Sequence, residues 1–287
     1  KFDVVISFSN SFAHGIITKP KTQHICYCYS PMRFAWDWYH EYLAENKIGL
    51  SLKGLYIRNL IHKIRIWDRV AADRVDLWIA QSNTAQKRNT KYYGVDSTII
   101  YPPVDLSKYS PSNNTADNYF LIVSRLEPYK RIDIAVKAIT KIKRPLVVIG
   151  EGSDLNNLKQ AAGKNIKFLG WQNDDTVIHY MKQARALILS GEEDFGLTPV
   201  EAMACGRPVV VYKRGGATET VLENKTGVFF DSDTPESLIG AIEILDTIYA
   251  KISPLECRKQ AEKFSQEIFL NNLESFVHKS WENFRIK

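Results

Sequence analysis

Two glutamates separated by seven residues, Glu193 and Glu201, lie in the stretch from Leu189 to Val221. The acidic turn that contains Glu193 follows an apolar segment, 186–189, and a loop with a glycine leads from it to Pro199, where the pattern predicts a helix start. Backbone N–H groups at a helix start bind phosphate, and carboxylates accept hydrogen bonds from hydroxyls. We therefore expect this stretch to hold a ligand that carries both phosphate and hydroxyl groups.

Two cations, Arg125 and Lys130, lie in the segment SRLEPYKR, directly after a predicted strand at 119–123. Ligands bind at the carboxyl ends of parallel strands, where such a loop lies. A guanidinium binds phosphate through two parallel hydrogen bonds, and an ammonium acts as a point charge, so the pair suits a diphosphate. Taken alone, such loop charges are usually just solvated, but their predicted position on the same sheet edge as Glu193, Gly196 and Glu201 favours a site.

A glycine pair, Gly150 and Gly152, follows the predicted strand at 146–149. The third glycine of a dinucleotide-binding G-x-G-x-x-G motif is absent, because Leu155 stands in its place. A nicotinamide enzyme is therefore disfavoured. Two interpretations of this turn stay open. Either a ligand approaches the backbone closely at Gly152, or the glycines only permit a tight turn.

Strands and helices alternate with short loops from residue 118 onward, which predicts a parallel, doubly wound α/β sheet. The predicted strands and helices of this part are 119–123, 132–141, 146–149, a helix ending near 162, 166–169, 174–183, 186–189, a helix from 199 to 205 and a strand at 209–211. The C-terminal part is predicted to be helical, at 234–249, 254–264 and 268–284.

The N-terminal part also contains apolar strands, at 4–7, 24–29, 75–81 and 98–101. The aromatic segment from Met32 to Leu43 is predicted to be a core-packing helix. Residues 106–117 are polar, turn-forming and without periodicity, so they form the predicted linker. We expect domains at 1–105 and 118–265, with 266–287 packing back on the first domain.

The segment from Leu52 to Ala72 alternates apolar and basic residues at helical spacing. Two interpretations stay open for this basic helix. It is either a surface helix docked on a sheet, or it contacts an anionic membrane or a lipid-linked acceptor.

The composition sets the class of protein. The 287 residues, 45% hydrophobic and 24% charged, suffice for one large or two ordinary globular domains. The net charge of +6 suits an anionic partner or a solvated surface, and no basic-aromatic motif indicates nucleic acid. Four scattered cysteines favour neither zinc nor disulfides, and no apolar run is long enough to span a membrane. We expect a cytoplasmic protein, or one at the inner face of the plasma membrane.

Five blocks, SRLEPYK, VIGEGSDL, FLG, EEDFGLTPVEAMACGRPVV and GGATETV, resemble in order and spacing the nucleotide-sugar-binding domain of glycosyltransferase family 4. The resemblance covers 118–225. It implies a GT-B fold, with two Rossmann-like parallel-sheet domains facing a cleft, and a retaining enzyme that requires no metal or other cofactor. The segments ICYCYSPMRFAWD and IIYPPVD are similar to bacterial mannosyltransferases of surface-polysaccharide assembly.

The resemblance also implies residue roles. Arg125 and Lys130 would hold the donor diphosphate and assist catalysis, Glu201 would bind the ribose, and Glu193 would face the transferred sugar. The remaining donor contacts would come from the loop and helix start, the glycine turn and the base-binding position, namely Phe195, Gly196, Leu197, Thr198, Gly152 and Trp171.

Two departures from the family pattern stand out. The histidine that commonly ends the strand HICYCY is replaced by Tyr29, and the nearby His14 and His24 match its position less well. The N-terminal domain is also expected to be incomplete, with much of the acceptor site in the missing part.

The sequence therefore predicts transfer of a hexose, foremost mannose from GDP-mannose, to a glycan or lipid-linked acceptor. The alternatives are another GT-B enzyme that uses a UDP-sugar and a non-catalytic nucleotide-sugar-binding subunit.

Overall fold

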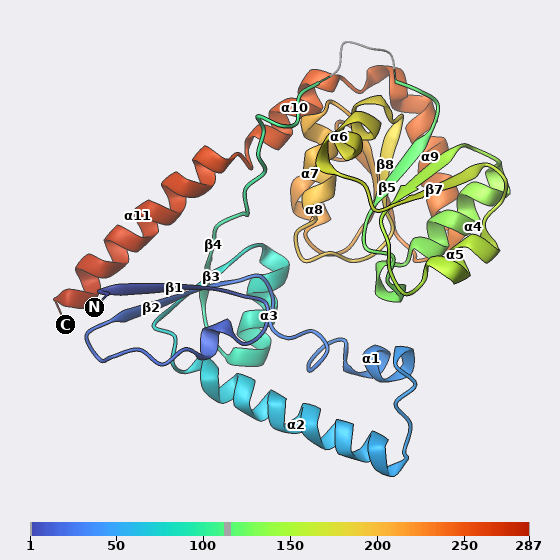
Figure 1. Cartoon of the computed structure of the whole chain (residues 1–287). Coiled ribbons are helices and arrows are strands. Elements are labelled where there is room, and N and C mark those ends of the chain that lie inside the picture. The colour runs from blue at the N-terminus through green and yellow to red at the C-terminus, as the bar shows by residue number, and fades with distance from the viewer. Residues whose placement is uncertain (1, 112–115, 287) are drawn as a thin grey trace. The chain divides into compact units, whose positions relative to one another are not determined.

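The computed structural model describes residues 2–111 and 116–286, and it divides into two compact units. The first unit comprises Lys1–Tyr101 with Phe269–Lys287, and the second comprises Pro102–Ile268. Each unit is built around one sheet, and all the strand pairs within the two sheets are parallel (Figure 1).

The sheet of the first unit has four strands in the order β1-β2-β3-β4. These strands are β1 (Val4–Ser9), β2 (Gln23–Cys28), β3 (Leu77–Ala80) and β4 (Ser97–Ile99). The connections contain the short η1 (Ala13–Gly15) and the helices α1 (Tyr39–Glu45), α2 (Leu52–Ala72) and α3 (Asn83–Tyr93). Ser51 and Ser82 cap α2 and α3, because each hydroxyl accepts a hydrogen bond from a backbone N–H of the first helical turn.

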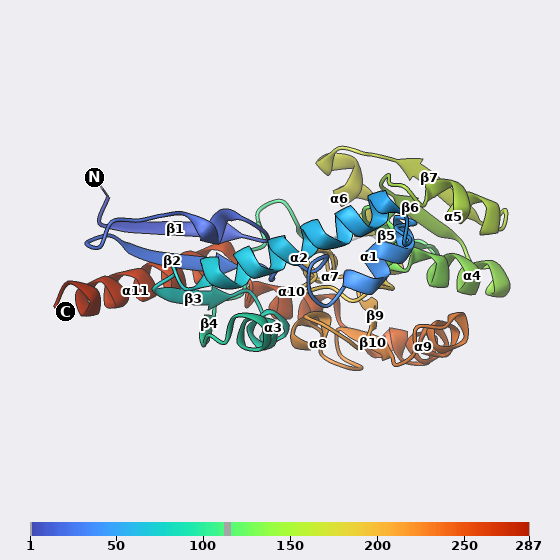
Figure 2. The ribbon, with the colours of Figure 1, turned by 90° about the horizontal axis from the view of Figure 1, so that it is seen from below.

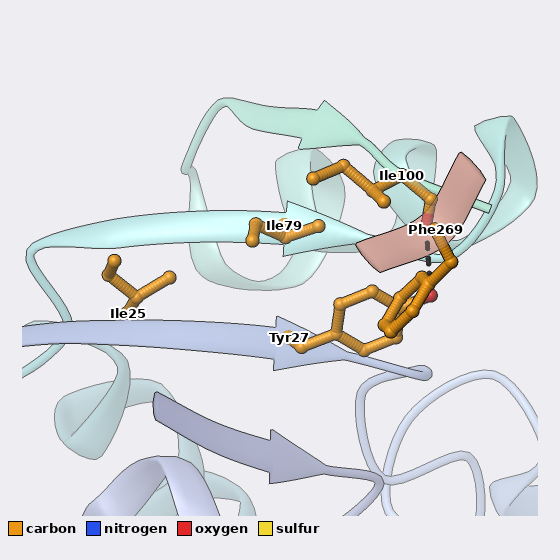
Figure 3. Packing of buried hydrophobic residues seen from close by; sticks show 5 residues of the cluster. All are labelled: Ile25, Tyr27, Ile79, Ile100 and Phe269. Carbon is orange, nitrogen blue, oxygen red and sulfur yellow. Dashed lines mark hydrogen bonds between the residues drawn. The ribbon is translucent and has the colours of Figure 1, made fainter. Parts of the chain in front are cut away.

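Alternate residues of β2 face opposite sides of this sheet, as the two-residue period of a strand requires. Ile25 and Tyr27 pack with Phe269 on one side (Figure 3), whereas Cys26 and Cys28 pack with residues of α2 and α3 on the other. The Tyr27 hydroxyl also donates a hydrogen bond to the Ile100 carbonyl, at 2.8 Å (Figure 3). A sheet covered on both faces accounts for the continuous burial of β2.

The helix α11 (Gln266–Arg285) covers one face of this sheet, and α2 and α3 lie on the other (Figures 1 and 2). Phe269, Leu273, Phe276 and Val277 recur at helical spacing and pack on the strands. Ser280, one turn further, donates to the Gln23 side chain at 3.3 Å. From Phe269 onward, the C-terminal helix thus belongs to the first unit.

The sheet of the second unit has six strands in the order β10-β9-β8-β5-β6-β7. These are β5 (Phe120–Val123), β6 (Leu146–Ile149), β7 (Ile166–Gly170), β8 (Ala186–Leu189), β9 (Val209–Tyr212) and β10 (Gly227–Phe230). Its helices are α4 (Ile132–Ile142), α5 (Leu155–Ala161), α6 (Asp174–Gln183), α7 (Leu197–Ala204), α8 (Ala217–Thr220), α9 (Pro235–Ile248) and α10 (Pro254–Glu262), with the short η2 (Pro128–Lys130) and η3 (Tyr249–Lys251).

The predicted helix from Met32 to Leu43 is wrong over its first half, because α1 begins only at Tyr39. Tertiary contacts hold the preceding residues in turns instead. The Arg65 guanidinium donates to the Ala35 carbonyl at 2.6 Å, and the Trp36 indole donates to Asp68 at 2.7 Å. The aromatic side chains do pack in the core of the α1–α2 region, as predicted.

Part of the predicted linker at 106–117 is bound to the second unit. Arg258 of α10 donates hydrogen bonds to the carbonyls of Leu106, Tyr109 and Ala204. Residues 112–115 of the linker lie outside the described residues.

All four cysteines are buried. Within the described ranges, none of the helices combines the length and apolar character of a membrane-spanning segment.

Phe269 should contribute strongly to the stability of the first unit. Phe269→Ala removes a ring packed on Tyr27 and should lower the free energy of unfolding by about 3 kcal/mol. The exposed neighbour Leu270 is the control, and Leu270→Ala should change the free energy of unfolding by less than about 0.5 kcal/mol. Urea unfolding followed by tryptophan fluorescence suits this test, since all tryptophans except Trp171 lie in the first unit. Equal effects of the two variants would contradict the docking of α11.

Candidate functional site

The strand order of the second unit reverses direction between β5 and β8. The chain proceeds from β5 outward to β6 and β7, and then returns to place β8 on the other side of β5. In parallel α/β sheets, ligands bind at the carboxyl ends of the strands beside such a reversal. The loop after β5 carries Arg125 and Lys130, and the loop after β8 carries Glu193. The topology therefore brings these two loops to the same sheet edge.

Lys130 and Glu193 form an ion pair through Nζ and Oε1. Their side chains are mostly buried, with exposed fractions of 15% and 24%. The Ser190 hydroxyl donates to the Lys130 carbonyl at 3.3 Å, which ties the two loops together through the backbone as well. A cation for phosphate and a carboxylate for hydroxyls are thus in direct contact at the reversal point.

Arg125 is exposed and contacts Tyr129 of the same loop. Tyr129 was not among the residues predicted from the sequence. The Arg125 Nη2 donates to the Tyr129 hydroxyl at 2.7 Å, and the Lys130 ammonium lies 5.1 Å from the centre of the Tyr129 ring. Tyr129 therefore contacts both cations, one through its hydroxyl and the other through its ring. Its only signal in the sequence is its place between the two cations in SRLEPYKR.

Gly152 lies where the loop after β6 packs against the loop after β5. A Cβ at this position would be 2.3 Å from the Leu126 carbonyl oxygen, so only glycine fits. The Asp154 N–H donates to the same oxygen at 2.9 Å. Gly152 thus supports the loop that carries Arg125, which is the tight-turn interpretation; contact with a donor stays a prediction.

The helix α7 begins at Leu197, two residues before the predicted start at Pro199. Gly196 precedes it with a φ of 86°, a left-handed conformation that glycine adopts without strain. Phe195 is buried against Phe264, with ring centres 5.5 Å apart, whereas Leu197 is exposed. The first N–H groups of the helix, including those of Leu197 and Thr198, have no partner within the helix and can bind an anion.

Glu201 lies in the second turn of α7 in a different environment from Glu193. Its side chain is hydrogen-bonded to the Tyr109 hydroxyl, and burial raises the pKa of its carboxyl above the ordinary value of 4.5. Burial and the nearby Glu201 carboxylate in turn raise the pKa of Tyr109. Tyr109 is a second residue that the sequence analysis missed, since it falls in the predicted linker.

Trp171 directly follows β7, at the edge of the six-stranded sheet. Trp171 is 71% exposed, and its backbone N–H donates weakly to the Glu151 carboxylate at 3.4 Å. The structure therefore gives Trp171 an open face for stacking but does not bring it into contact with the Lys130–Glu193 pair.

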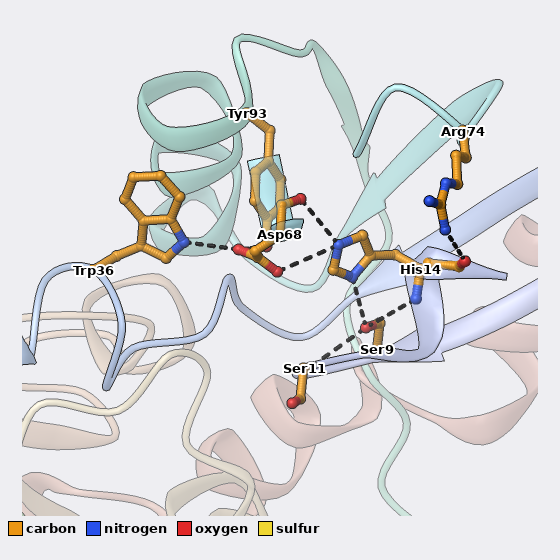
Figure 4. A network of polar contacts seen from close by, with 8 residues as sticks. Ser9, Ser11, His14, Trp36, Asp68, Arg74 and Tyr93 are labelled. Atoms are coloured by element: carbon orange, nitrogen blue, oxygen red, sulfur yellow. Dashed lines mark hydrogen bonds and ion pairs between the residues drawn. The ribbon is translucent and has the colours of Figure 1, made fainter. Parts of the chain in front are cut away.

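A buried polar network lies beyond the carboxyl end of β1 in the first unit (Figure 4). His14 Nε2 is 3.3 Å from Asp68 Oδ1, and His14 Nδ1 is 3.4 Å from the Ser9 hydroxyl. Asp68 Oδ2 accepts hydrogen bonds from Trp36 and from Tyr93, at 2.7 and 2.9 Å. Burial raises the pKa of Asp68. The network fastens η1, α2 and α3 to one another.

The family pattern places a histidine where this chain has Tyr29. Neither His14 nor His24 is available to take the place of that histidine. His14 is enclosed in the network above, and His24 is fully buried, with Ser7 Oγ 2.8 Å from its Nε2. Burial lowers the pKa of His24. Tyr29, by contrast, lies just after β2 with its side chain partly exposed. Of His14, His24 and Tyr29, only the Tyr29 side chain is accessible to a ligand.

Comparison with known proteins identifies the family. Residues 105–264 match the family described as "Glycosyl transferases group 1". An uncharacterized glycosyltransferase of Methanocaldococcus jannaschii, MJ1178, is 30% identical over 152 residues, which are 51% of this chain and 40% of that protein. The D-inositol 3-phosphate glycosyltransferase of Rhodococcus jostii is 27% identical over 67% of this chain and 50% of its own length. The chain thus spans about half the length of the curated relatives it matches.

Solved structures with the same fold cover both units. Sucrose-phosphate synthase from Thermosynechococcus elongatus superposes with a TM-score of 0.78 at 17% identity, over 98% of this chain and 74% of that one. Anabaena HepE in complex with UDP gives 0.71 at 19% identity, over 90% of this chain and 72% of that one. The two parallel sheets are those of a GT-B fold, and the chain belongs to the glycosyl transferases group 1 family of enzymes.

Proposed function

We propose that this chain transfers a hexose from a nucleotide-sugar donor, with retention of anomeric configuration, to a glycan or lipid-linked acceptor. The observation that carries the proposal is the contact between Lys130 and Glu193 where the strand order reverses. A nucleotide sugar needs positive charge for its diphosphate directly beside acceptors for its sugar hydroxyls. The pair supplies both, next to the N-terminus of α7.

Different residues of the site bind different parts of the nucleotide-sugar donor. Arg125 and Lys130 bind the diphosphate and stabilise the negative charge that develops on it as it leaves, in place of a metal ion. The N–H groups at the start of α7, from Phe195 to Thr198, add donors for the same oxygens. When a donor binds, the Lys130 ammonium exchanges part of its contact with Glu193 for phosphate, and this frees the carboxylate for the hexose hydroxyls.

The nucleoside is bound further along α7 and at the sheet edge. Glu201 accepts hydrogen bonds from the ribose hydroxyls, and the Tyr109 hydroxyl orients its carboxylate. Trp171 stacks on the base through its exposed face.

Retention requires that the acceptor attack from the side on which the nucleoside diphosphate leaves. The acceptor oxygen forms the bond to the anomeric carbon as the bond from that carbon to the phosphate oxygen breaks. The acceptor proton passes to the departing phosphate oxygen. This route needs positioning and charge stabilisation, which the described residues offer, and no enzymic nucleophile.

Mannose from GDP-mannose is the donor we propose to test first, on the resemblance of ICYCYSPMRFAWD and IIYPPVD to mannosyltransferases. A UDP-sugar is the second candidate, because similar structures include HepE bound to UDP and to UDP-glucose. A non-catalytic nucleotide-sugar-binding role is the third, supported by Tyr29 in the place of the family's histidine. Thermal-shift titration with a panel of nucleotide sugars separates the first two.

Glu193 should be required for transfer but not for nucleotide affinity. Glu193→Gln removes the charge that faces the sugar, so we expect the rate of nucleoside diphosphate release to fall about a hundredfold or more. Nucleoside diphosphate binding, measured by calorimetry, should be nearly unchanged. Glu236→Gln, at an exposed glutamate of α9, is the matched control and should keep full activity. Full activity of Glu193→Gln would exclude Glu193 from the mechanism, and an inactive wild type would favour the binding role.

Arg125 and Lys130 should act on the phosphates alone. Hydrogen bonds to charged groups contribute about 1.5 to 3 kcal/mol each, so Arg125→Ala/Lys130→Ala should bind the nucleoside diphosphate at least about a hundredfold more weakly. Affinity for the corresponding nucleoside, measured by the same calorimetry, should stay constant. Normal affinity of the double variant for the diphosphate would refute the proposed phosphate contacts.

Glu201 should make donor binding sensitive to acid. Because burial raises its pKa above 4.5, Glu201 gains a proton at a higher pH than an ordinary glutamate and then accepts ribose hydrogen bonds less well. Binding should therefore weaken as the pH falls through the raised pKa. The folded protein binds this proton more tightly than the unfolded chain does, so Glu201 contributes stability below its ordinary pKa, and this contribution is lost as the pH rises. The weakening is thus not unfolding driven by Glu201.

The measurement is the ratio of wild-type to Glu201→Gln affinity for the nucleoside diphosphate across the acidic range. The ratio cancels titration of the phosphates themselves. It should decline toward acid, and a ratio independent of pH would contradict the role of Glu201 as a ribose acceptor.

A further inference from the structure

The helix α2 presents an apolar face to solvent as well as to the core. Ile57, Ile61 and Ile64 pack against residues of α1 and its neighbours. At 100° per residue, a second set of exposed apolar side chains, the apolar stripe, falls on the opposite side of the helix, namely Leu52, Leu55, Tyr56, Leu60, Ile66 and Val70. Leu52 is 88% exposed and Tyr56 is 67% exposed. Continuous exposure of this kind marks an interaction surface.

The charges on α2 have one sign wherever they reach solvent. The only acidic residue of the helix is Asp68, which is fully buried in the network with His14. The basic and histidine side chains are Lys53, Arg58, His62, Lys63, Arg65 and Arg69. Lys63 falls within the apolar stripe at helical spacing, and long basic side chains can extend past apolar neighbours to reach phosphate. The helix therefore combines exposed apolar area with positive charge.

A pocket of about 440 Å³ is lined by residues of α1, by the segment that follows α1 and by Arg58 of α2. His40, Lys47 and Arg58 line it together with the apolar Leu43 and Ile48. No acidic side chain is among the described residues that form its lining. Arg58 is held in place, because its Nη2 donates to the Ile48 carbonyl at 3.0 Å. The pocket is thus suited to an anionic group attached to an apolar body.

We propose that α2 and the adjacent pocket form a docking surface for a bilayer of anionic phospholipid. The apolar stripe enters the boundary between head groups and acyl chains, and His40, Lys47 and Arg58 bind a lipid phosphate. This surface lies entirely in the first unit, so the proposal does not depend on the donor or on sugar transfer.

Charge favours a bilayer over a second copy of the chain. In a two-fold symmetric dimer through α2, the same face meets itself, so Lys53 and Lys63 would approach the lysines of the other copy. Like charges across an interface are destabilising, whereas anionic head groups complement them. The absence of acidic residues from the exposed part of this fully described helix gives a partner protein no alternating pattern to match.

The test is sedimentation of the chain with vesicles, without any nucleotide sugar. We expect binding to vesicles of equal parts phosphatidylcholine and phosphatidylglycerol, weaker binding to phosphatidylcholine alone, and loss of the difference at high salt. Leu52→Ser/Tyr56→Ser should weaken binding to the anionic vesicles at least about tenfold. Leu255→Ser/Ile244→Ser, at exposed apolar residues of α10 and α9, is the matched control and should bind as the wild type does.

A further variant, Lys47→Ala, tests the pocket separately from the stripe. Lys47→Ala should weaken binding to the anionic vesicles about fivefold and leave binding to phosphatidylcholine unchanged. Tryptophan fluorescence and urea unfolding of each variant establish that the first unit is folded. The proposal would be overturned if the wild-type protein did not sediment with anionic vesicles. It would also be overturned if Leu52→Ser/Tyr56→Ser bound these vesicles as tightly as the wild type does. Self-association that the stripe variant abolishes, without vesicle binding, would instead identify a second copy as the partner.

Discussion

The ion pair between Lys130 and Glu193 depends on one feature of topology, the return of the chain from β7 to β8 on the far side of β5. Residues 63 positions apart can meet only because β5 and β8 are neighbours with parallel direction. The loops after these strands leave the sheet at the same edge, and the Ser190 hydroxyl donates a hydrogen bond to the Lys130 carbonyl between them. The chemistry of the site is therefore a consequence of strand order, and any change that separates β5 from β8 removes it.

The two glutamates of the E-x7-E pattern occupy opposite electrostatic environments. Glu193 is in contact with a cation, whereas Glu201 is buried beside a neutral phenol that hydrogen-bonds to it. The carboxylate of Glu193 lies against the Lys130 ammonium and balances part of the positive charge of the site proposed to bind phosphate. A carboxyl held by Tyr109 away from cations can instead be directed at neutral hydroxyls. The difference in surroundings supports a division of roles that spacing alone does not reveal.

Regular elements could be predicted from the sequence where the pattern is local. The strands β6 and β8 and the helix α6 have the predicted bounds, since each is a short apolar run or a capped amphipathic segment. The segment at 32–38 could not be predicted, because Arg65 and Asp68, distant in sequence, fix its conformation. Tyr109 was hidden for the same reason, in a polar stretch that Arg258 holds on the second unit. The parallel sheets followed from the alternation of elements, but contacts across the sheet required the structure.

The residues proposed to bind the donor, from Arg125 to Glu201, all belong to the second unit. Their contacts with one another are made within that unit, so the geometry for holding a nucleotide sugar is built into a single sheet and its loops. The first unit contributes features of another kind, an exposed tyrosine after β2 and a basic helix with an apolar outer face. The proposed donor site and the proposed docking surface thus lie in separate units, so substitutions in one unit can test either proposal without altering the residues of the other.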